Sequence, residues 1–193
     1  MHSKKILVEI KKLKKYFPVS SGFFNKDKTF VKAVDNVSFN LFKGETLGLV
    51  GESGCGKTTI GRTILRLLEP TAGEIIFNGQ NISLLNQREL RPLRTKMQII
   101  FQDPYSSLNP RMNIGDMLSE ALLVHKIVPK KEISKEVRRL LDVVGLTVSH
   151  INKYPHEFSG GQRQRIGIAR ALSVKPELII CDEAVSALDV SIQ

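Results

Sequence analysis

The stretch "GESGCGKTT", Gly51 to Thr59, decides the fold of this chain. It matches the pattern G-x-x-x-x-G-K-[ST], in which a glycine-rich loop wraps around the phosphates of a nucleotide. Gly54 and Gly56 allow successive backbone N–H groups to point at phosphate oxygens, and the helix that follows adds partial positive charge at its start. Lys57 is suited to the β- and γ-phosphates, and the Thr58 hydroxyl is suited to Mg²⁺.

The segments around this loop have the strand and helix patterns that the motif requires. "ETLGLVG", residues 45–51, predicts a short buried strand, and a helix is expected from Lys57 to about Leu68. Alternating patterns predict strands over 5–13 and 30–42, and Asn78-Gly79 between two apolar runs predicts a hairpin. "KMQIIFQ", residues 96–102, is expected to be another buried strand.

The second half of the sequence is mainly helical in pattern. Helices are expected between about 111 and 158, with Gly145 as a helix C-cap, and again over 159–173, before a last strand in "ELIICDE", residues 177–183. This order predicts an α/β fold with a mainly parallel core sheet, an antiparallel β region and a helical subdomain.

Composition excludes several classes of protein. The 193 residues are 41% hydrophobic, which fits about one domain with a real core, and no apolar run approaches the roughly 18 residues of a membrane span. The basic N-terminus lacks the continuous apolar region of a signal peptide. Cys55 and Cys181 lack metal-ligand spacing, so we expect reduced, unpaired thiols in a cytosolic protein.

The net charge of +10 is partly local, because the first 43 residues hold ten lysines against three acidic residues. Such a block could attract nucleic acid or anionic lipid. The aromatic side chains of a base-stacking surface are not interleaved with it, so we interpret it as a solvated face.

Two adjacent carboxylates follow the last apolar run, "LIIC". A buried strand would deliver Asp182 to a metal ion through water, and Glu183 would polarise the water that attacks the γ-phosphate. The sequence "DEAV" at 182–185 also has the form found in nucleic-acid helicases, so a helicase-like ATPase is an alternative.

A second candidate anion site lies in "FSGGQRQR", residues 158–165. Ser159 and Gln162 have the spacing of a capping box, and Gly160 and Gly161 would expose backbone N–H groups at a helix start. A single nucleotide between two copies of the chain could use the loop at 51–59 of one copy and this helix start of the other.

The motif "SGGQRQRIGIARAL" resembles the signature motif of ATP-binding cassette (ABC) ATPases, and it directly precedes the acidic strand as in that family. "SALD", ending at Asp189, is similar to the family's D-loop, and Gln102 to its Q-loop glutamine. Tyr16 resembles the aromatic residue that stacks on adenine. The resemblance implies an ABC-type nucleotide-binding domain with ATP and Mg²⁺ as cofactors.

The resemblance also implies a role for each site residue. The catalytic residues would be Glu183, Lys57 and Gln102, and the Mg²⁺ ligands Thr58, Gln102 and Asp182. The nucleotide would contact Tyr16, Gly51, Ser53, Gly54, Cys55, Gly56, Lys57, Thr58, Thr59, Gln102 and Asp182 of one subunit. The second subunit would contribute Ser159, Gly160, Gly161, Gln162 and Asp189.

A closer resemblance joins "KYFPVSSGFF", "VKAVDNVSF" and "IFQDPYSSLNPRM" to the ATP-binding subunits of oligopeptide and dipeptide importers. It implies an ATPase at the cytoplasmic face of the membrane, paired with an identical or different ATPase subunit and docked on transmembrane permease subunits. A peptide-binding protein would be an indirect partner, and no nucleic acid is expected. Some relatives import nickel or other solutes, so the cargo stays open.

On this resemblance the chain divides into an antiparallel β region with the loop core (1–101), a Q-loop and helical subdomain (102–158), and the signature helix, acidic strand and D-loop (159–193). Ala184 stands where the family usually has proline. The family continues into a strand with a switch histidine, which is absent here, so we expect a C-terminally truncated domain that hydrolyses ATP poorly. An ABC-type ATPase acting on nucleic acid and an inactive nucleotide-binding fragment are further alternatives.

Overall fold

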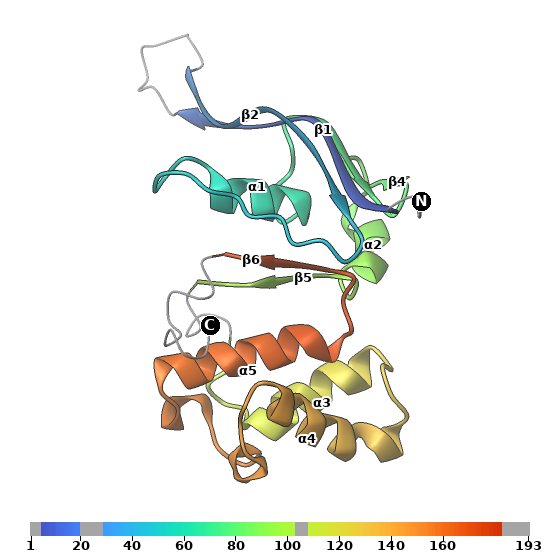
Figure 1. Ribbon diagram of the computed structural model, residues 1–193, viewed down its shortest axis with the longest axis vertical. Helices are drawn as coiled ribbons and strands as arrows, with labels where there is room; N and C mark the ends of the chain where they lie inside the picture. Colours follow the sequence, from blue (N-terminus) through green and yellow to red (C-terminus); the bar gives the residue numbers. More distant parts are fainter. Residues whose placement is uncertain (1–4, 20–28, 103–107, 183–193) are drawn as a thin grey trace. The chain divides into compact units, whose positions relative to one another are not determined.

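The computed structural model describes residues 5–19, 29–102 and 108–182 (Figure 1). The chain forms two compact units, Met1–Leu90 and Arg91–Gln193, here called the N-terminal and the C-terminal unit. The division of the sequence at 101 and 158 into functional segments stays a prediction.

The N-terminal unit is built on a four-stranded antiparallel sheet with the order β2-β1-β3-β4. Its strands are β1 (Ile6–Val19), β2 (Thr29–Phe42), β3 (Ala72–Phe77) and β4 (Gln80–Asn81). The predicted strands are confirmed, and β1 extends beyond its predicted end at 13 because it pairs with β2 along its length. The buried side chains of this sheet include Leu7, Val8, Ile10, Leu13, Ile75 and Phe77.

The hairpin between β3 and β4 is also confirmed. Asn78 and Gly79, at the centre of the turn, have φ of 49° and 82°, and Phe77 pairs with Gln80 across it. Positive φ at both central positions matches the right-handed twist of the flanking strands, which explains the preference for Asn-Gly here.

The helix after the loop is shorter than predicted. The helix α1 spans Lys57–Ile64 and is followed by a turn in which Arg66 has φ of 55°. The buried guanidinium of Arg66 donates to the carbonyl oxygens of Ile82 (3.0 Å) and Leu85 (2.9 Å). This turn leads toward β3, and it leaves Leu67 exposed instead of on a continuing apolar helix face.

The prediction of a buried strand at 45–51 is wrong for the described structure. Residues 45–50 form no strand, and Leu47 and Val50 are 44% and 96% exposed. An apolar run forms a strand only when a neighbouring strand pairs with its backbone groups. None of the strands β1–β4 pairs with this segment in the described part of the N-terminal unit.

The C-terminal unit contains the parallel strand pair, β5 (Met97–Ile100) and β6 (Leu178–Cys181). Met97 pairs with Leu178 and Ile100 with Cys181, so segments far apart in the sequence lie side by side. The helix α5 (Gly160–Ser173) packs against β5 on one side and against α3 (Ile114–Val124) and α4 (Ile133–Val143) on the other (Figure 1).

The helical subdomain has its own apolar core. The remaining described elements are a short helix α2 (Gln87–Leu90) in the N-terminal unit and 3₁₀ turns at Arg91–Leu93, Lys130–Glu132, Val148–His150 and Pro155–Glu157. The core includes Ile114, Met117, Leu118, Leu122, Ile133, Val137, Leu140, Leu141, Ile166 and Ala169. Among the described residues, no helix has both the length and the apolar character needed to cross a membrane.

The helix end predicted at Gly145 is confirmed, although the C-cap residue itself is Val144 and Gly145 follows it. Gly145 has φ of 68°, and the N–H of Leu146 donates to the carbonyl oxygen of Leu141 at 2.9 Å. This bond satisfies a carbonyl that the end of α4 leaves without an intrahelical partner.

We expect Leu141→Ala to lower the free energy of unfolding by about 2–5 kcal/mol, because Leu141 is 0% exposed and its loss leaves a cavity. Val143→Ala, two positions along the same helix and 55% exposed, should change it by less than about 0.5 kcal/mol. Urea denaturation followed by circular dichroism measures both. Equal effects of the two changes would contradict the assignment of α4 to this core.

Candidate nucleotide-binding site

The loop before α1 depends on glycine at two positions. Gly54 has φ of 81° and Gly56, which is the N-cap of α1, has φ of 99°. Residues with a Cβ are strained in this left-handed region. The loop therefore turns sharply and ends at the start of a helix, where the positive end of the helix dipole favours an anion.

The Lys57 ammonium is hydrogen-bonded to the backbone of this loop. Its Nζ donates to the carbonyl oxygens of Gly51 and Glu52, both at 2.7 Å, and lies 3.8 Å from the Cys55 sulfur. A Cβ on Gly51 would stand 2.7 Å from that sulfur, so Cys55 packs tightly against the start of the loop. Two of the predicted phosphate-binding residues, Gly51 and Cys55, thus lie beside the positive charge of Lys57.

The end of the loop lies against strand β2. A Cβ on Gly56 would collide with the carbonyl oxygen of Ala33. Ala33 is the extra residue of a β-bulge, since Tyr16 pairs with Lys32 while the preceding Lys15 pairs with Val34. Bulges bend a strand and redirect its side chains, and they are common beside active sites.

Tyr16 lies at this bulge, so the N-terminal unit brings it to the same part of the sheet as the loop. Its backbone N–H donates to Thr71 Oγ1 at 2.9 Å, and its hydroxyl donates to Asp35 Oδ1 at 2.5 Å. The Lys32 ammonium lies 5.6 Å from the centre of the Tyr16 ring and 3.8 Å from Asp35 Oδ2. Tyr16 itself is half-buried.

The hydrogen bond between Tyr16 and Asp35 shifts the pKa values of the two side chains in opposite directions. The Asp35 carboxylate raises the pKa of Tyr16 by accepting its proton in a hydrogen bond, and that bond lowers the pKa of Asp35. The bond is therefore present at neutral pH. Its charge-assisted form is lost as pH falls through the lowered pKa of Asp35, and the Tyr16 donor is lost as pH rises through its raised pKa.

In the C-terminal unit, the parallel strands bring Gln102 and Asp182 to one edge. Asp182 follows β6 directly, and its N–H donates to the carbonyl oxygen of Ile100 at 2.9 Å, two residues before Gln102. Because parallel strands have their carboxyl ends at the same edge, both side chains start from that edge. Glu183 and Asp189 lie outside the described residues.

The capping box predicted at the start of α5 is confirmed. Ser159 Oγ accepts from the Gln162 N–H at 3.3 Å, and Gln162 Oε1 accepts from the Ser159 N–H at 3.1 Å. A Cβ on Gly160 would meet nothing within 4 Å. The first turn of α5 is therefore well formed and uncovered at Gly160 within the described structure.

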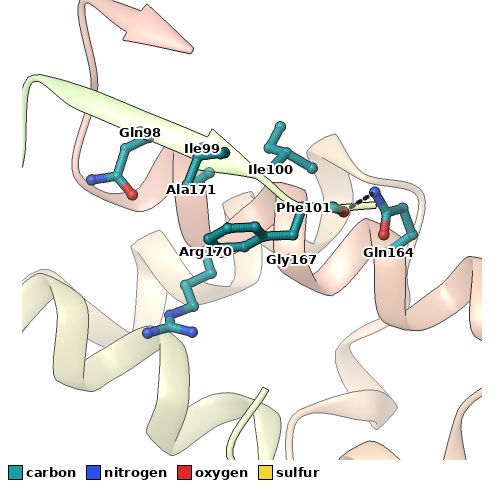
Figure 2. A pocket seen from close by; sticks show the side chains of 8 residues that line it. All are labelled: Gln98, Ile99, Ile100, Phe101, Gln164, Gly167, Arg170 and Ala171. Carbon is teal, nitrogen blue, oxygen red and sulfur yellow. Dashed lines mark hydrogen bonds between the residues drawn. The ribbon is translucent and has the colours of Figure 1, made fainter. Parts of the chain in front are cut away.

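Gln164 connects α5 to the segment that leads to Gln102. It is 1% exposed, and its Nε2 donates to the carbonyl oxygen of Phe101 at 3.3 Å. Figure 2 shows this side chain reaching from α5 to the end of β5, beside a cavity of about 290 Å³. The residues that line the cavity are Gln98, Ile99, Ile100, Phe101, Gln164, Gly167, Arg170 and Ala171.

The predicted Mg²⁺ ligands all carry side-chain oxygen atoms, which are the ligands that Mg²⁺ prefers. The described residues contain no cluster of three or more His, Cys, Asp or Glu side chains that could hold a metal. Mg²⁺ is usually held by one or two protein oxygens together with phosphate oxygens and water, so a dense cluster is not needed. The Thr58 hydroxyl, the Gln102 amide and the Asp182 carboxylate are oxygen donors of this kind.

Sequence reasoning missed Ala33, Asp35 and Gln164. Asp35 is separated from Tyr16 by 19 positions, and only the bulged register of β1 and β2 reveals their contact. The sequence did contain a signal that Gln164 is buried and hydrogen-bonded, because it is a polar residue two positions before the apolar Ile166 in a helix expected to pack on a core.

Comparisons with known proteins show the family of this chain. The family model described as "ABC transporter" matches residues 34–186. The chain is 58% identical over 189 residues to the "Oligopeptide transport ATP-binding protein OppF" of Bacillus subtilis (strain 168), covering 97% of this chain and 60% of that protein. It is 56% identical over 187 residues to the "Glutathione import ATP-binding protein GsiA" of Escherichia coli (strain K12), covering 97% and 30%.

A solved structure described as "Dimeric structure of a post-hydrolysis state of the ATP-binding cassette MJ0796 bound to ADP and Pi" matches with a TM-score of 0.82 at 28% identity. The match covers 96% of this chain and 78% of that chain. The predicted fold class is thereby confirmed. The chain spans less than two thirds of the length of the curated relatives named above.

The pKa of Tyr16 gives a spectroscopic prediction. In an alkaline titration of tyrosinate absorbance, the step lost in Tyr16→Phe should lie above the ordinary value of about 10. Asp35→Ala should move that step down toward the ordinary value, because it removes the hydrogen bond and the negative charge. An unchanged step would contradict the contact between the two side chains.

We expect Gln164→Leu to lower the free energy of unfolding by about 1–3 kcal/mol, because the substitution removes the donor to the Phe101 carbonyl. Glu120→Leu, on the exposed side of α3, is the control and should change it by less than about 0.5 kcal/mol. Chemical denaturation measures both, and an effect of Gln164→Leu no larger than that of the control would refute the link.

Proposed function

Because the chain belongs to the ABC transporter family, we propose that it is the ATP-binding and ATP-hydrolysing part of a subunit that powers peptide import across a membrane. The observation that carries this proposal is the Lys57 ammonium, which is held at 2.7 Å from two loop carbonyls at the start of α1. A fixed ammonium beside a helix N-terminus suits a triphosphate.

The N-terminal unit would bind the nucleotide itself. The phosphates would lie in the loop formed by Gly51, Ser53, Gly54, Cys55, Gly56, Lys57, Thr58 and Thr59. Tyr16 would stack on the adenine. The contact between Gly56 and Ala33 supports this pairing of roles, because it fixes the loop against the strand that faces Tyr16.

The C-terminal unit would supply groups for hydrolysis. We assign Mg²⁺ to Thr58, Gln102 and Asp182, and the polarisation of the attacking water to Glu183. Bound Mg²⁺ would neutralise charge on the β- and γ-phosphates. The hydrogen bond between Asp182 and Ile100 supports these roles, since it keeps the start of the acidic segment beside the strand that leads to Gln102.

A second ATPase subunit would complete the site through Ser159, Gly160, Gly161, Gln162 and Asp189. The capping box supports this assignment, because it holds the first turn of α5 in place and leaves backbone N–H groups directed out of the helix start. The solved relative MJ0796 is likewise described as a dimeric cassette, bound to ADP and Pi.

Peptide import is the transport reaction that the relatives favour. OppF is named for oligopeptide transport, and GsiA for import of glutathione, which is itself a tripeptide. By this analogy the subunit would act at the cytoplasmic face of the membrane, docked on transmembrane permease subunits and served indirectly by a peptide-binding protein.

We expect Lys57→Ala to weaken ATP binding in the presence of Mg²⁺ by roughly 10- to 150-fold, because it removes charge-assisted hydrogen bonds worth about 1.5–3 kcal/mol. Lys11→Ala removes an equal charge from an exposed position on β1 and should leave the affinity within about twofold of the unchanged chain. Isothermal titration calorimetry measures both.

Two results would overturn this function. Failure of the unchanged chain to bind ATP would remove its basis, as would equal affinities for ATP in the chain and in Lys57→Ala. ATP hydrolysis stimulated by single-stranded nucleic acid would favour the helicase-like alternative instead.

A further inference from the structure

We propose that Asp35 is a positioning residue for Tyr16, whose ring it holds in the plane needed to stack on the adenine of ATP. This inference rests on the proposed function, because Tyr16 has an adenine to stack on only if the chain binds ATP. It concerns a carboxylate that would not itself touch the nucleotide.

The backbone of Tyr16 is held on both sides. It pairs with Lys32 on β2, and its N–H donates to Thr71 Oγ1 at 2.9 Å. The neighbouring segment is fixed as well, since the Thr71 N–H donates to the carbonyl oxygen of Lys14 at 2.8 Å. The remaining freedom of Tyr16 is therefore rotation about its side-chain bonds.

The hydrogen bond to Asp35 restricts that rotation. The Tyr16 hydroxyl lies 2.5 Å from Asp35 Oδ1, a distance typical of a strong O–H donor to a charged carboxylate. Because the hydroxyl oxygen lies on the axis from Cβ through the far end of the ring, fixing it together with Cα fixes the first side-chain torsion. The phenolic O–H lies in the plane of the ring, so its direction toward Asp35 also restricts rotation of the ring about that axis. The ring then presents defined faces before a base binds, so binding loses less conformational entropy.

The bulge at Ala33 explains how Asp35 reaches Tyr16. In a regular strand, residues three apart point to opposite faces. The extra residue in β2 restores Lys32 and Asp35 to the same face, where their side-chain charges lie 3.8 Å apart and both approach Tyr16. The same Ala33 carbonyl faces Gly56, so one bulge relates the aromatic ring to the phosphate loop.

Lys32 makes the two faces of the ring different. Its ammonium lies 5.6 Å from the ring centre, which leaves the opposite face for a base. The Lys32 and Asp35 side chains are 61% and 45% exposed. Exposed ion pairs add little to stability, so the pair of Lys32 and Asp35 contributes little to the free energy of folding. Its role is to orient the Tyr16 ring.

The test compares ATP with inorganic tripolyphosphate, which has no base. In calorimetric titrations of the full chain with Mg²⁺, Asp35→Ala should weaken ATP binding about 3- to 10-fold, which is part of the stacking contribution. It should leave tripolyphosphate binding unchanged. Asp35→Asn keeps an oxygen acceptor and should restore ATP affinity to within about twofold. Glu74→Ala, an exposed carboxylate on β3, is the matched control and should match the unchanged chain.

A double-mutant comparison makes the mechanism specific. Tyr16→Phe should weaken ATP binding as much as Asp35→Ala does, and the double variant should be no weaker than either single one, because both remove the same bond. Strictly additive effects would overturn the proposal. So would an equal loss of ATP and tripolyphosphate affinity in Asp35→Ala, since that result reports a damaged loop.

The failures of the two hypotheses are distinguishable. If the unchanged chain binds ATP and Asp35→Ala binds it equally well, the positioning role is refuted and the proposed function stands. If the unchanged chain binds no ATP, the proposed function is refuted and the positioning role with it.

Discussion

The candidate site of the N-terminal unit depends on the close approach of Gly56 to the carbonyl oxygen of Ala33. Only a residue without a Cβ fits there, and its φ of 99° excludes most side chains independently. The bulge in β2 supplies the other half of the contact, because Ala33 is the residue without a partner in β1. The end of the loop and the start of α1 therefore lie against the strand that pairs with Tyr16.

The C-terminal unit uses one helix for two purposes. The first turn of α5 forms the capping box with Ser159 and Gln162, and in its second turn Gln164 bonds to Phe101, the residue before Gln102. A displacement of β5 at its carboxyl end would therefore act directly on this helix. On the proposed function, the residue that would contact Mg²⁺ and the turn that would contact the nucleotide of a second subunit are linked through the hydrogen bond from Gln164 to Phe101 and the first two turns of α5.

The sequence predicts the features that local backbone chemistry determines. The capping box, the Asn78-Gly79 turn and the helix end at Gly145 follow from side-chain oxygens or positive φ at single positions, so a short pattern is enough. The prediction of a strand at 45–51 is wrong because a strand forms only beside another strand that pairs with it. The residues of the segment itself do not show whether such a neighbour exists. The contact of Tyr16 with Asp35 escapes prediction for a similar reason, since it depends on a bulge that shifts the register between two strands.

On the proposed function, binding and chemistry share some residues of this chain, but most of the groups that would recognise the base and the phosphates lie in the N-terminal unit. The aromatic ring, the ammonium and the glycine loop belong to residues 16–59, and on the proposed function they recognise a base and phosphates that carry their full charge before any reaction. Gln102 and Asp182 belong to the parallel strand ends and would act on the metal and the water. The first set is held by contacts internal to the N-terminal unit, such as Gly56 with Ala33 and Tyr16 with Asp35. On the proposed function, nucleotide recognition would therefore depend mainly on local contacts, and hydrolysis would also need groups of the C-terminal unit and of a second subunit.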